Sequence, residues 1–347
     1  MIEVINKVVG RIFPGSEAHI VETIKSGLIN TTLKIRIGEA YFAFQNVNTV
    51  VFNEPEIIHE NLAVLEKHIA QNGLEFKLVA PLSDPSGESL IESEGMYYRI
   101  FPWVKEGHTI QAVNNPQIAY EAAKQFAGFT RTFETVNLKQ LQPVIRNFHN
   151  LPLRYNQLND AFYNAPEIRR DHIRDEFNVL INEFSFLVGV FNEMTLDPQF
   201  KQRVMHHDAK ISNVLFDEAD RGLCVIDLDT VMPGFIISDW GDMMRTYLSP
   251  ANEEETDPEK VIVRKEYFEA IQDGYLEVMG DKLNKIESTS LMNSGMIIIY
   301  MQALRFLADH LNFNVYYGAD YDGHNLRRAR NQIKLLRELQ RFAKEQK

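Results

Sequence analysis

Three polar residues near the middle of the chain have the types and the spacing that phosphoryl transfer requires. Asp208 follows an apolar approach and a pair of histidines, Asn213 stands five positions after it, and Asp227 ends the next apolar run. Transfer of a phosphoryl group from ATP needs a carboxylate to orient the attacking hydroxyl, and an amide plus a carboxylate to hold magnesium on the phosphates. We therefore expect Asp208 to act on the hydroxyl, and Asn213 and Asp227 to bind Mg²⁺.

A β-hairpin is predicted to position these side chains. Residues 213–216 and 223–226 are apolar runs of strand length, and the polar segment 217–222 between them reads as a turn. Asp227 then follows directly on the return strand, while Asp208 lies in the loop that leads into the hairpin and Asn213 begins its first strand.

The segment that contains Asp208 and Asn213 resembles a known catalytic motif. His206-His207-Asp208-Ala209-Lys210-Ile211-Ser212-Asn213 resembles the catalytic loop of the aminoglycoside phosphotransferase and choline kinase superfamily, which is related to the protein kinases. The resemblance implies that Asp208 is the catalytic residue, that Lys210 lies near the transferred phosphate, and that ATP and Mg²⁺ are the cofactors. It also implies an α+β, protein-kinase-like fold of two lobes. The first lobe would be a small antiparallel sheet plus one helix, and the second lobe would be larger and mostly helical.

The first 104 residues fit the nucleotide-binding lobe. Residues 19–23, 31–37 and 41–45 read as three antiparallel strands. The loop between the first two is where a kinase covers the nucleotide phosphates, so Gly27, Asn30 and Thr31 are candidate nucleotide contacts. A single glycine also suits an ordinary turn, and that alternative stays open.

Gln45 departs from the kinase pattern, because it stands at the end of the third strand where a lysine usually contacts the phosphates. An amide donates hydrogen bonds to phosphate oxygens but carries no charge. Either another group supplies the positive charge or magnesium carries more of it. An inactive nucleotide-binding protein would also tolerate this residue.

The rest of the first lobe is predicted as follows. Asn53, Pro55 and Glu56 favour a helix start with an Asn cap, and Glu60 on that helix is the candidate for the conserved kinase glutamate. Residues 78–82, 89–92 and 96–101 read as further strands. The segment with Phe101 and Trp103 reads as a hinge that contacts adenine, with the domain boundary at 104.

Residues 105–347 read as a mostly helical lobe for catalysis and acceptor binding. Helices are expected from Pro116, over 173–191, and in two long segments at 282–312 and 320–345. Their aromatic stripes indicate core, and residues 146–155 read as a capping segment. Asp239 and Asp242 are expected to brace the catalytic loop, whereas Asp229 is a candidate substrate or metal contact.

Within the superfamily, the chain is most similar to the N-acetylhexosamine 1-kinases. The likeness lies in residues 148–155, 225–234, 239–242, 305–309, 315–317 and 324–327, and it includes Gln45, which such kinases also tend to carry. Leu28 departs from it, since a histidine commonly occupies that position. The resemblance implies a sugar acceptor phosphorylated at its anomeric hydroxyl, with Arg305, Asp309 and Tyr317 on the sugar side. Arg305 and Asp309, four apart on a helix, can pair.

Composition limits the alternatives. The net charge of -12 disfavours nucleic acid as a partner, and the most apolar stretch, 296–307, is too short to span a bilayer. The single cysteine, Cys224, and the charged N-terminus favour a cytoplasmic protein without a membrane anchor. A kinase for choline, homoserine or an aminoglycoside stays open, because residues 253–255 are acidic, as does a non-catalytic nucleotide-binding sensor. The oligomeric state is not predicted.

Overall fold

A computed structural model describes residues 1–24 and 29–346, which form two compact units. The first unit consists of residues 1–110, 132–146 and 212–233, and the second of residues 111–131, 147–211 and 234–347. The first unit thus includes the hairpin with Asn213 and Asp227, which the predicted division at residue 104 assigns to the second domain.

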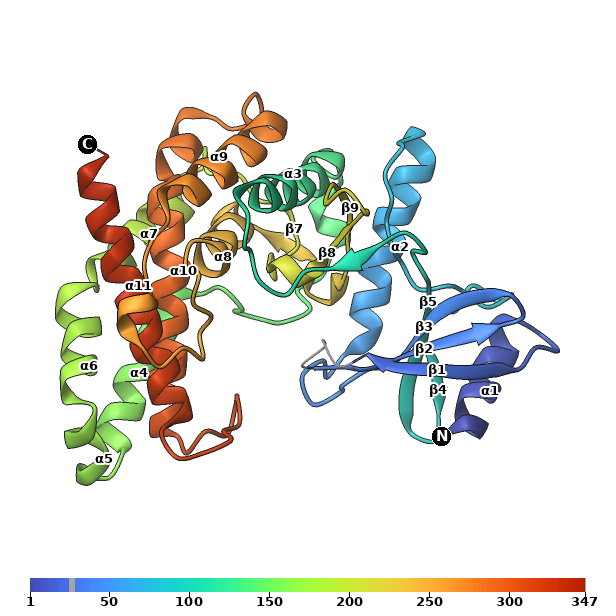
Figure 1. The fold of residues 1–347 in the computed structure, drawn as a ribbon, viewed down its shortest axis with the longest axis horizontal. Coiled ribbons are helices and arrows are strands. Elements are labelled where there is room, and N and C mark those ends of the chain that lie inside the picture. The colour runs from blue at the N-terminus through green and yellow to red at the C-terminus, as the bar shows by residue number, and fades with distance from the viewer. Residues whose placement is uncertain (25–28, 347) are drawn as a thin grey trace. The chain divides into compact units, whose positions relative to one another are not determined.

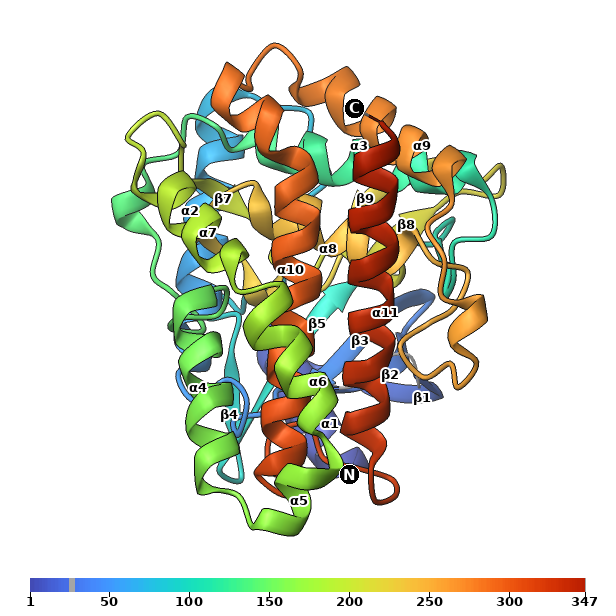
Figure 2. The same cartoon turned by 90° about the vertical axis from the view of Figure 1, so that its left-hand side faces the viewer.

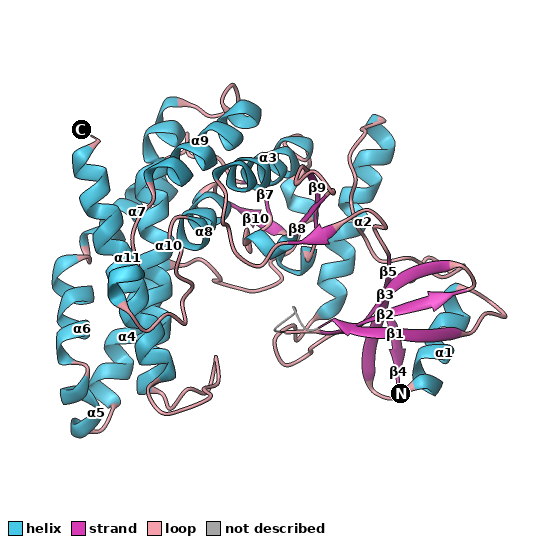
Figure 3. Cartoon of the chain, viewed as in Figure 1, coloured by secondary structure: helices cyan, strands magenta, loops and turns pink. Residues whose placement is uncertain are grey.

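The first unit is organised on a five-stranded antiparallel sheet with the order β1-β2-β3-β5-β4 (Figures 1 and 3). Its strands are β1 (Ala18–Ile24), β2 (Thr31–Ile37), β3 (Ala40–Asn46), β4 (Ile91–Ser93) and β5 (Met96–Pro102). The first three confirm the prediction to within one residue. The register sets Gln45 on β3 directly opposite Arg99 on β5. An antiparallel pair of this kind brings the two side chains onto the same face of the sheet.

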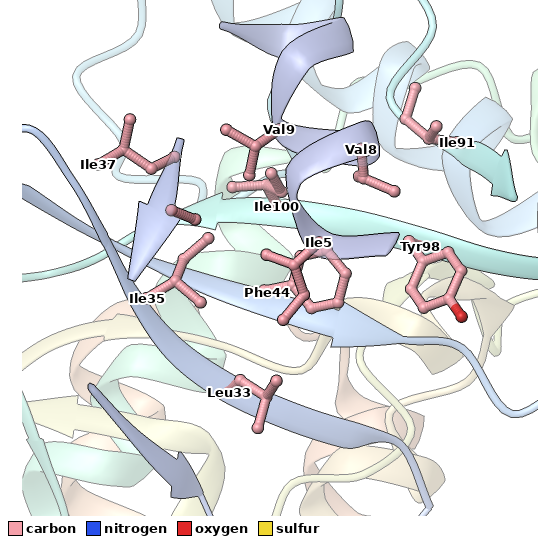
Figure 4. Close-up of a cluster of buried hydrophobic side chains, with 11 residues drawn as sticks. Ile5, Val8, Val9, Leu33, Ile35, Ile37, Phe44, Ile91, Tyr98 and Ile100 are labelled. Carbon is pink, nitrogen blue, oxygen red and sulfur yellow. The ribbon is translucent and has the colours of Figure 1, made fainter. Parts of the chain in front are cut away.

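Helix α1 (Ile2–Ile12) covers one face of this sheet and is absent from the predicted fold, which allows one helix in this lobe. Figure 4 shows its Ile5, Val8 and Val9 against strand residues such as Ile35 and Phe44, all of them buried. The apolar side chains recur at helical spacing over only three turns, and so short a repeat does not predict a helix from sequence by itself. Burial of this face stabilises the helix, as is usual for short amphipathic helices.

Helix α2 (Pro55–Asn72) begins as predicted, but the expected Asn cap is wrong. Glu54 occupies the capping position and makes no side-chain bond to the helix, while Pro55 suits the first turn. The helix ends at Gly73 in the left-handed conformation that glycine adopts without strain. Asn61 is buried and its amide donates to the carbonyl oxygens of Gln142 and Val231 at 2.8 and 2.9 Å. Helix α2 is thereby fixed to the segment that follows Asp227.

The strand predicted at 78–82 does not form. Within this segment Leu82 donates to the carbonyl of Ile100 at 2.7 Å, but the neighbouring Pro81 has no N–H to extend a ladder. Apolar composition alone therefore over-predicts a strand here.

The predicted hairpin of the first unit is confirmed. Strands β8 (Val214–Phe216) and β9 (Gly222–Val225) are antiparallel, and β6 (His108–Thr109) pairs with the other edge of β8. Strand β9 also carries Cys224, which is buried and free, in agreement with the prediction of a small core residue.

The second unit is mostly helical and is built around α10 (Figures 1 and 2). Figure 2 shows α10 and α11 side by side, and α10 also packs against α4, α7 and α8. The helices are α3 (Pro116–Thr132), α4 (Leu151–Asn164), α5 (Glu167–His172), α6 (Arg174–Asn178), α7 (Phe186–Leu196), α8 (Ile237–Tyr247), α9 (Lys265–Met279), α10 (Lys285–Leu311) and α11 (His324–Glu345). The two remaining strands are β7 (Arg203–Met205) and β10 (Met232–Gly234).

Helix α10 has 27 residues, longer than the apolar stretch considered from sequence, and by length and composition it could cross a membrane. Most of its apolar residues are nevertheless buried inside the unit, as in the core helix of a globular domain. Its contact with α8 is close, because a Cβ at Gly241 would lie 2.3 Å from Cγ1 of Ile298. Only glycine fits at this crossing without displacing α10.

The long helix predicted over 173–191 is interrupted. Residues 179–183 form a π-turn between α6 and α7, and Leu180 rather than Ile181 faces the core. A π-turn inserts an extra residue and shifts the apolar stripe, so the 3.6-residue period predicts one helix where there are two. The segment before α4 caps that helix as predicted, since Asn150 Oδ1 accepts from the N–H of Leu153 at 3.1 Å.

Candidate active site

The predicted catalytic loop of the second unit is anchored by one buried carboxylate, that of Asp239. Asp239, in the first turn of α8, accepts the backbone N–H groups of His206 and His207 at 2.9 and 2.7 Å. The side chain is fully buried, and burial raises its pKa to about 6, although the neighbouring His206 and the two N–H donors lower it. The predicted brace is confirmed for Asp239, which fixes two consecutive peptides immediately before Asp208.

His207 turns the chain toward Asp208 in a left-handed conformation, with φ of 68°. Such a value is uncommon for a residue with a side chain and often marks a functional turn. Its imidazole lies against Gly234, where a Cβ would come within 2.4 Å of His207 Cε1. Glycine at 234 therefore lets the His207 ring occupy this position.

Two further contacts hold the loop on either side of Asp208. The His206 ring is buried edge-on against Phe126 and Phe129 of α3, and the Tyr247 hydroxyl donates to the Ala209 carbonyl at 2.8 Å. The aromatic stripe of α3, predicted as core, thus also supports the catalytic loop. Removal of either contact would loosen the backbone that carries Asp208.

Asp208 and Lys210, the two predicted catalytic residues, contact each other. Lys210 Nζ lies 2.7 Å from Asp208 Oδ2, and the two side chains are 33% and 29% exposed. Both are therefore accessible to a reactant while their backbone is fixed. A carboxylate in this setting can accept a hydrogen bond from a hydroxyl, and the ammonium group can stabilise negative charge that develops on a transferred phosphoryl group.

A second buried acid, Asp242, lies behind the loop on α8. Burial raises its pKa and the Asp208 charge raises it further, whereas Arg245, 2.8 Å away, lowers it. Arg245 also contacts Glu253 at 3.3 Å. Arg245 thus compensates the negative charge that two neighbouring carboxylates create around Asp208, as buried charges require.

The predicted magnesium ligands lie together in the first unit, at the open end of the β8–β9 hairpin. The Asn213 carbonyl accepts the N–H of Ile226 at 2.8 Å, so the residues before β8 and after β9 stay paired. Asp227 follows with φ of 61°, a left-handed conformation that Asp tolerates better than most residues. Amide and carboxylate oxygens are donors that suit Mg²⁺, which takes its remaining ligands from water and phosphate.

The Gln45 side chain belongs to a polar network rather than standing alone. Arg99 donates to Gln45 Oε1 through Nε at 2.8 Å and through Nη2 at 2.5 Å, and Gln45 Nε2 donates to the Thr32 hydroxyl. Arg99 Nη2 also lies 2.6 Å from the Asp229 carboxylate, which accepts from Asn30 Nδ2 at 2.7 Å. Asp229 is therefore the counter-ion of Arg99, and the substrate or metal contact expected from sequence stays a prediction.

The other predicted nucleotide contacts are placed as follows. Gly27 lies outside the described residues, and Thr31 is exposed at the start of β2. Glu60 is exposed and its carboxylate accepts from Gln142 Nε2 at 2.6 Å, so it takes no part in the Gln45 network. Phe101 lies beside the Arg99 guanidinium at 5.0 Å, and the Trp103 ring packs under Lys34 Nζ at 4.3 Å.

His59 on α2 adds a titratable group to this network. Its Nδ1 lies 2.7 Å from the Ser89 hydroxyl, and burial lowers its pKa to about 4, with the Arg99 charge lowering it further and Asp229 opposing. The unfolded chain binds a proton at His59 below about pH 6.5, but the folded chain binds one only below about pH 4. His59 therefore destabilises the fold progressively as the pH falls through this window.

We expect the free energy of unfolding to fall by up to about 3 kcal/mol between pH 7 and pH 4 through His59. Denaturant titrations of the wild type and of His59→Gln across this range measure the effect as the difference between the two pH profiles. Parallel profiles would contradict the assignment, whereas a variant that loses less stability on acidification supports it.

The predicted acceptor residues of the second unit form a cation–aromatic cluster, defined as Arg305, Phe148, Tyr316 and Tyr317. The Arg305 guanidinium lies 5.3–5.5 Å from the centroids of the three rings and donates to the Tyr316 hydroxyl at 3.2 Å. The Tyr317 hydroxyl accepts from Gln302 Nε2 at 3.1 Å. Arg305 is half-buried, as expected, and its side chain is fixed by the cluster.

Asp309 contacts backbone groups and Asn325, and the ion pair with Arg305 that the sequence predicts is not found among the described residues. Its two carboxylate oxygens accept the backbone N–H groups of Tyr316 and Tyr317 at 2.8 and 2.9 Å and the Asn325 amide at 3.0 Å. The buried Asp309 thus braces the segment that carries the tyrosines, while Arg305 donates to Gln302 and Tyr316 in place of the expected pair with Asp309. Its part in acceptor binding stays a prediction.

The acidic side chains of residues 253–255 are paired with basic residues. Glu253 contacts Arg245 and Arg328, and Glu254 contacts Arg327 at 3.0 Å and His324 at 2.7 Å. Glu255 pairs with Lys260 at 3.2 Å. These carboxylates therefore do not form the open negative site that a cationic acceptor needs.

His149 lies next to Phe148 of the cation–aromatic cluster, and its pKa is affected by the charges nearby. It is 2.8 Å from the Ser238 hydroxyl and 3.4 Å from the His207 ring. Burial lowers its pKa well below the usual value, and the charges of His207, Arg305, Arg154 and Arg245 lower it further. Burial is the main cause, and three arginines near the cluster add to it.

Comparison with known proteins agrees with this arrangement. The sequence model of the phosphotransferase enzyme family matches residues 20–280. That span includes the sheet from β1 onward, the catalytic loop and the hairpin with Asn213 and Asp227.

Solved structures share the fold at low sequence identity. A microcompartment-associated aminopropanol kinase is 12% identical with a TM-score of 0.68, and a spectinomycin phosphotransferase in complex with ADP and spectinomycin is 11% identical with a TM-score of 0.61. Each of these comparisons covers 99% of this chain and 98% of the other. The choline kinase of Cryptosporidium parvum is 16% identical with a TM-score of 0.59, over 98% of this chain and 97% of that one. The protein-kinase-like α+β fold is thereby confirmed.

Proposed function

Since the chain belongs to the phosphotransferase enzyme family and is an ATP-dependent small-molecule phosphotransferase, we propose that its acceptor is a sugar, phosphorylated at the anomeric hydroxyl. An N-acetylated hexose is the acceptor that the sequence resemblance favours.

Asp208 is proposed to orient the anomeric hydroxyl and to accept its proton as the phosphoryl group is transferred. The two backbone bonds from Asp239 and the bond from Tyr247 fix the loop, so that this carboxylate needs little reorganisation. Lys210, 2.7 Å from Asp208, is proposed to stabilise the charge on the transferred group.

Asn213 and Asp227 are proposed to hold Mg²⁺, which offsets the negative charge of the nucleotide phosphates when bound. Both residues provide oxygen donors at the open end of one hairpin. Asp208 and Asn213 are five residues apart, so chain connectivity alone keeps their Cα atoms within about 18 Å.

The acceptor class is argued from charge. Arg305 covers the rings of Phe148, Tyr316 and Tyr317, which in an amine-binding site would be open to the ligand cation. The nearby glutamates 253 and 254 are paired with arginines. A cationic acceptor would meet the positive charge of Arg305 without an open carboxylate, whereas the hydroxyl groups of a neutral polyol can accept hydrogen bonds from Arg305. The occupation of the rings by Arg305 is the observation that carries the choice.

An acceptor panel with ATP tests the proposal. ATP consumption would be measured with N-acetylglucosamine, N-acetylgalactosamine, galactose, choline, homoserine and kanamycin, and with the methyl glycoside of each sugar as a matched control. We expect turnover of a free sugar and none of its methyl glycoside, whose anomeric oxygen is blocked. Turnover of the glycoside would rule out the anomeric position, and turnover of choline or kanamycin alone would rule out a sugar. A silent panel despite ATP binding would favour the non-catalytic sensor.

Replacement of Arg305 by leucine tests the acceptor site. Loss of charged hydrogen bonds worth about 1.5–3 kcal/mol is expected to raise KM for the sugar roughly 10- to 100-fold, with KM for ATP unchanged. Arg330→Leu is the matched control, because its ion pair with Glu176 lies at the surface of α11. Equal kinetics in the two variants would show that Arg305 does not bind the acceptor.

A further inference from the structure

The first unit contains a buried arginine that the assigned chemistry does not use. Arg99 lies on β5, is 1% exposed, and stands directly across from Gln45, which occupies the position of the usual phosphate-binding lysine. We propose that Arg99 supplies the positive charge for the nucleotide phosphates in place of that lysine, moved from β3 to the neighbouring strand. This inference rests on the proposed use of ATP.

The hydrogen bonds of Arg99 fix its guanidinium at the Gln45 side chain. Nε and Nη2 both donate to Gln45 Oε1, at 2.8 and 2.5 Å, and the β3–β5 ladder holds the two backbones in register. Glutamine is suited to this role, because its carbonyl accepts from the arginine while its amide donates to Thr32. A lysine at 45 would place a second cation against Arg99. The pair Gln45–Arg99 therefore delivers one positive charge, in the same place on the sheet face as the single lysine of other kinases.

The ion pair of the kinase fold is reproduced with both members changed. In protein kinases the strand lysine is held by a glutamate of the following helix. Here the corresponding helix α2 turns Glu60 outward to Gln142, and the anion is Asp229, 2.6 Å from Arg99 Nη2. Asp229 stands two residues after the proposed magnesium ligand Asp227. The cation is thus tied to the metal-binding segment, which Asn30 of the β1–β2 connection also contacts at 2.7 Å.

One N–H donor of the Arg99 guanidinium, Nη1, is not used by the Gln45–Asp229 network. Within the described part of the chain, Arg99 Nη1 is buried and has no hydrogen-bond partner. An unpaired buried donor on a charged group is costly, and such groups in native proteins usually have a ligand, water or ion as partner. His59, whose pKa burial and the Arg99 charge lower, is neutral at pH 7 and adds no competing cation. A phosphate oxygen is the partner that the charge, the planar geometry and the position beside Gln45 favour.

A purely structural ion pair is the alternative. Because Arg99 and Asp229 are buried at 1% and 4% exposure, loss of the arginine leaves an unpaired carboxylate and destabilises the unit in either case. Stability by itself therefore does not separate the two roles. Exchange of the charge between the facing positions 45 and 99 separates the two roles, since it restores a cation without restoring Arg99.

The experiment uses the full-length protein and four forms, namely the wild type, Arg99→Gln, Arg99→Lys and the exchange variant Gln45→Lys/Arg99→Gln. Binding of ATP, ADP and adenosine is measured by calorimetry with Mg²⁺, and folding is checked by thermal unfolding. We expect Arg99→Gln to weaken ATP and ADP binding roughly 10- to 100-fold and adenosine binding less than twofold. The exchange variant is expected to recover at least a third of the binding free energy for ATP that Arg99→Gln loses. The reason is that it returns the positive charge to position 45, where other kinases carry the lysine.

The binding data decide the inference as follows. A selective loss of ATP and ADP affinity that the exchange variant reverses supports it. Equal binding of ATP by the wild type and a folded Arg99→Gln overturns it, as does a parallel loss for adenosine. If Arg99→Gln does not fold, the exchange variant and Arg99→Lys carry the test, and failure of both to bind ATP while folded overturns the inference. A wild type that binds no ATP would instead refute the proposed function, so the two failures are distinguishable.

Discussion

Replacement of Asp208 by asparagine is expected to lower kcat for the sugar by roughly 10²- to 10⁴-fold while leaving the affinity for ATP unchanged. Asparagine has the same size but cannot accept the hydroxyl proton, and it removes the charge that pairs with Lys210. The backbone contacts from Asp239 and Tyr247 involve neighbouring residues and are retained. Steady-state ADP release gives kcat, and calorimetric titration with ATP gives the binding constant.

Asp281→Asn is the matched control, since this aspartate forms a surface ion pair with Arg131 and is 62% exposed. Its kcat is expected to equal that of the wild type. A variant Asp208→Asn that keeps more than a tenth of wild-type kcat would show that Asp208 is not the base. Loss of ATP binding in that variant would show that the residue acts on the nucleotide instead.

Arg203→Met is expected to lower the free energy of unfolding by about 3–5 kcal/mol. Arg203 on β7 pairs with Glu287 of α10, with Nη2 and Oε2 at 3.1 Å, and the two side chains are 2% and 0% exposed. Glu287 also completes the capping box of α10 with Asn284. Without Arg203, the Glu287 carboxylate would be buried without a compensating charge. Position 203 lies three residues before His206, where the predicted catalytic loop begins. Denaturant unfolding followed by circular dichroism measures the change.

A second substitution separates charge from packing. Arg203→Met/Glu287→Gln removes both charges and keeps an acceptor for the helix cap, so we expect it to recover more than half of the lost stability. Arg131→Met, which breaks an exposed pair with Asp281, is expected to cost about 0–1 kcal/mol. If Arg203→Met and Arg131→Met lowered the free energy of unfolding equally, the buried ion pair would contribute no more to stability than the exposed one.

The elements that the sequence predicts well are those with a strong local period. Strands β1–β3, the β8–β9 hairpin and the two closing helices are found within a few residues of their predicted ranges. The predictions fail where a local signal is overruled. Residues 78–82 are apolar but do not join the sheet, and a π-turn divides the helix predicted over 173–191. Helix α1 was too short to stand out and depends on the sheet that it covers.

Some site residues have a signal in the sequence that is visible only in retrospect. Arg99 is a lone charge in the apolar strand Met96–Pro102, and a buried arginine requires a partner. Asn61 and His59 lie on the buried side of α2, next to the exposed Glu60 that the kinase pattern favours. A polar residue among apolar neighbours is therefore a better guide here than the position of a conserved acid in distant relatives.

The sequence by itself determined the reaction class, because Asp208, Asn213 and Asp227 lie close together along the chain and their spacing is set by covalent structure. Tertiary structure alone decided the partners of Asp229, Asp309 and Gln45. Their contacts join residues such as Arg99 and Asp229, 130 positions apart, which no local period links. A charge placed in a sequence has many possible partners, and only packing selects which of them is close enough to compensate it in a low-dielectric interior.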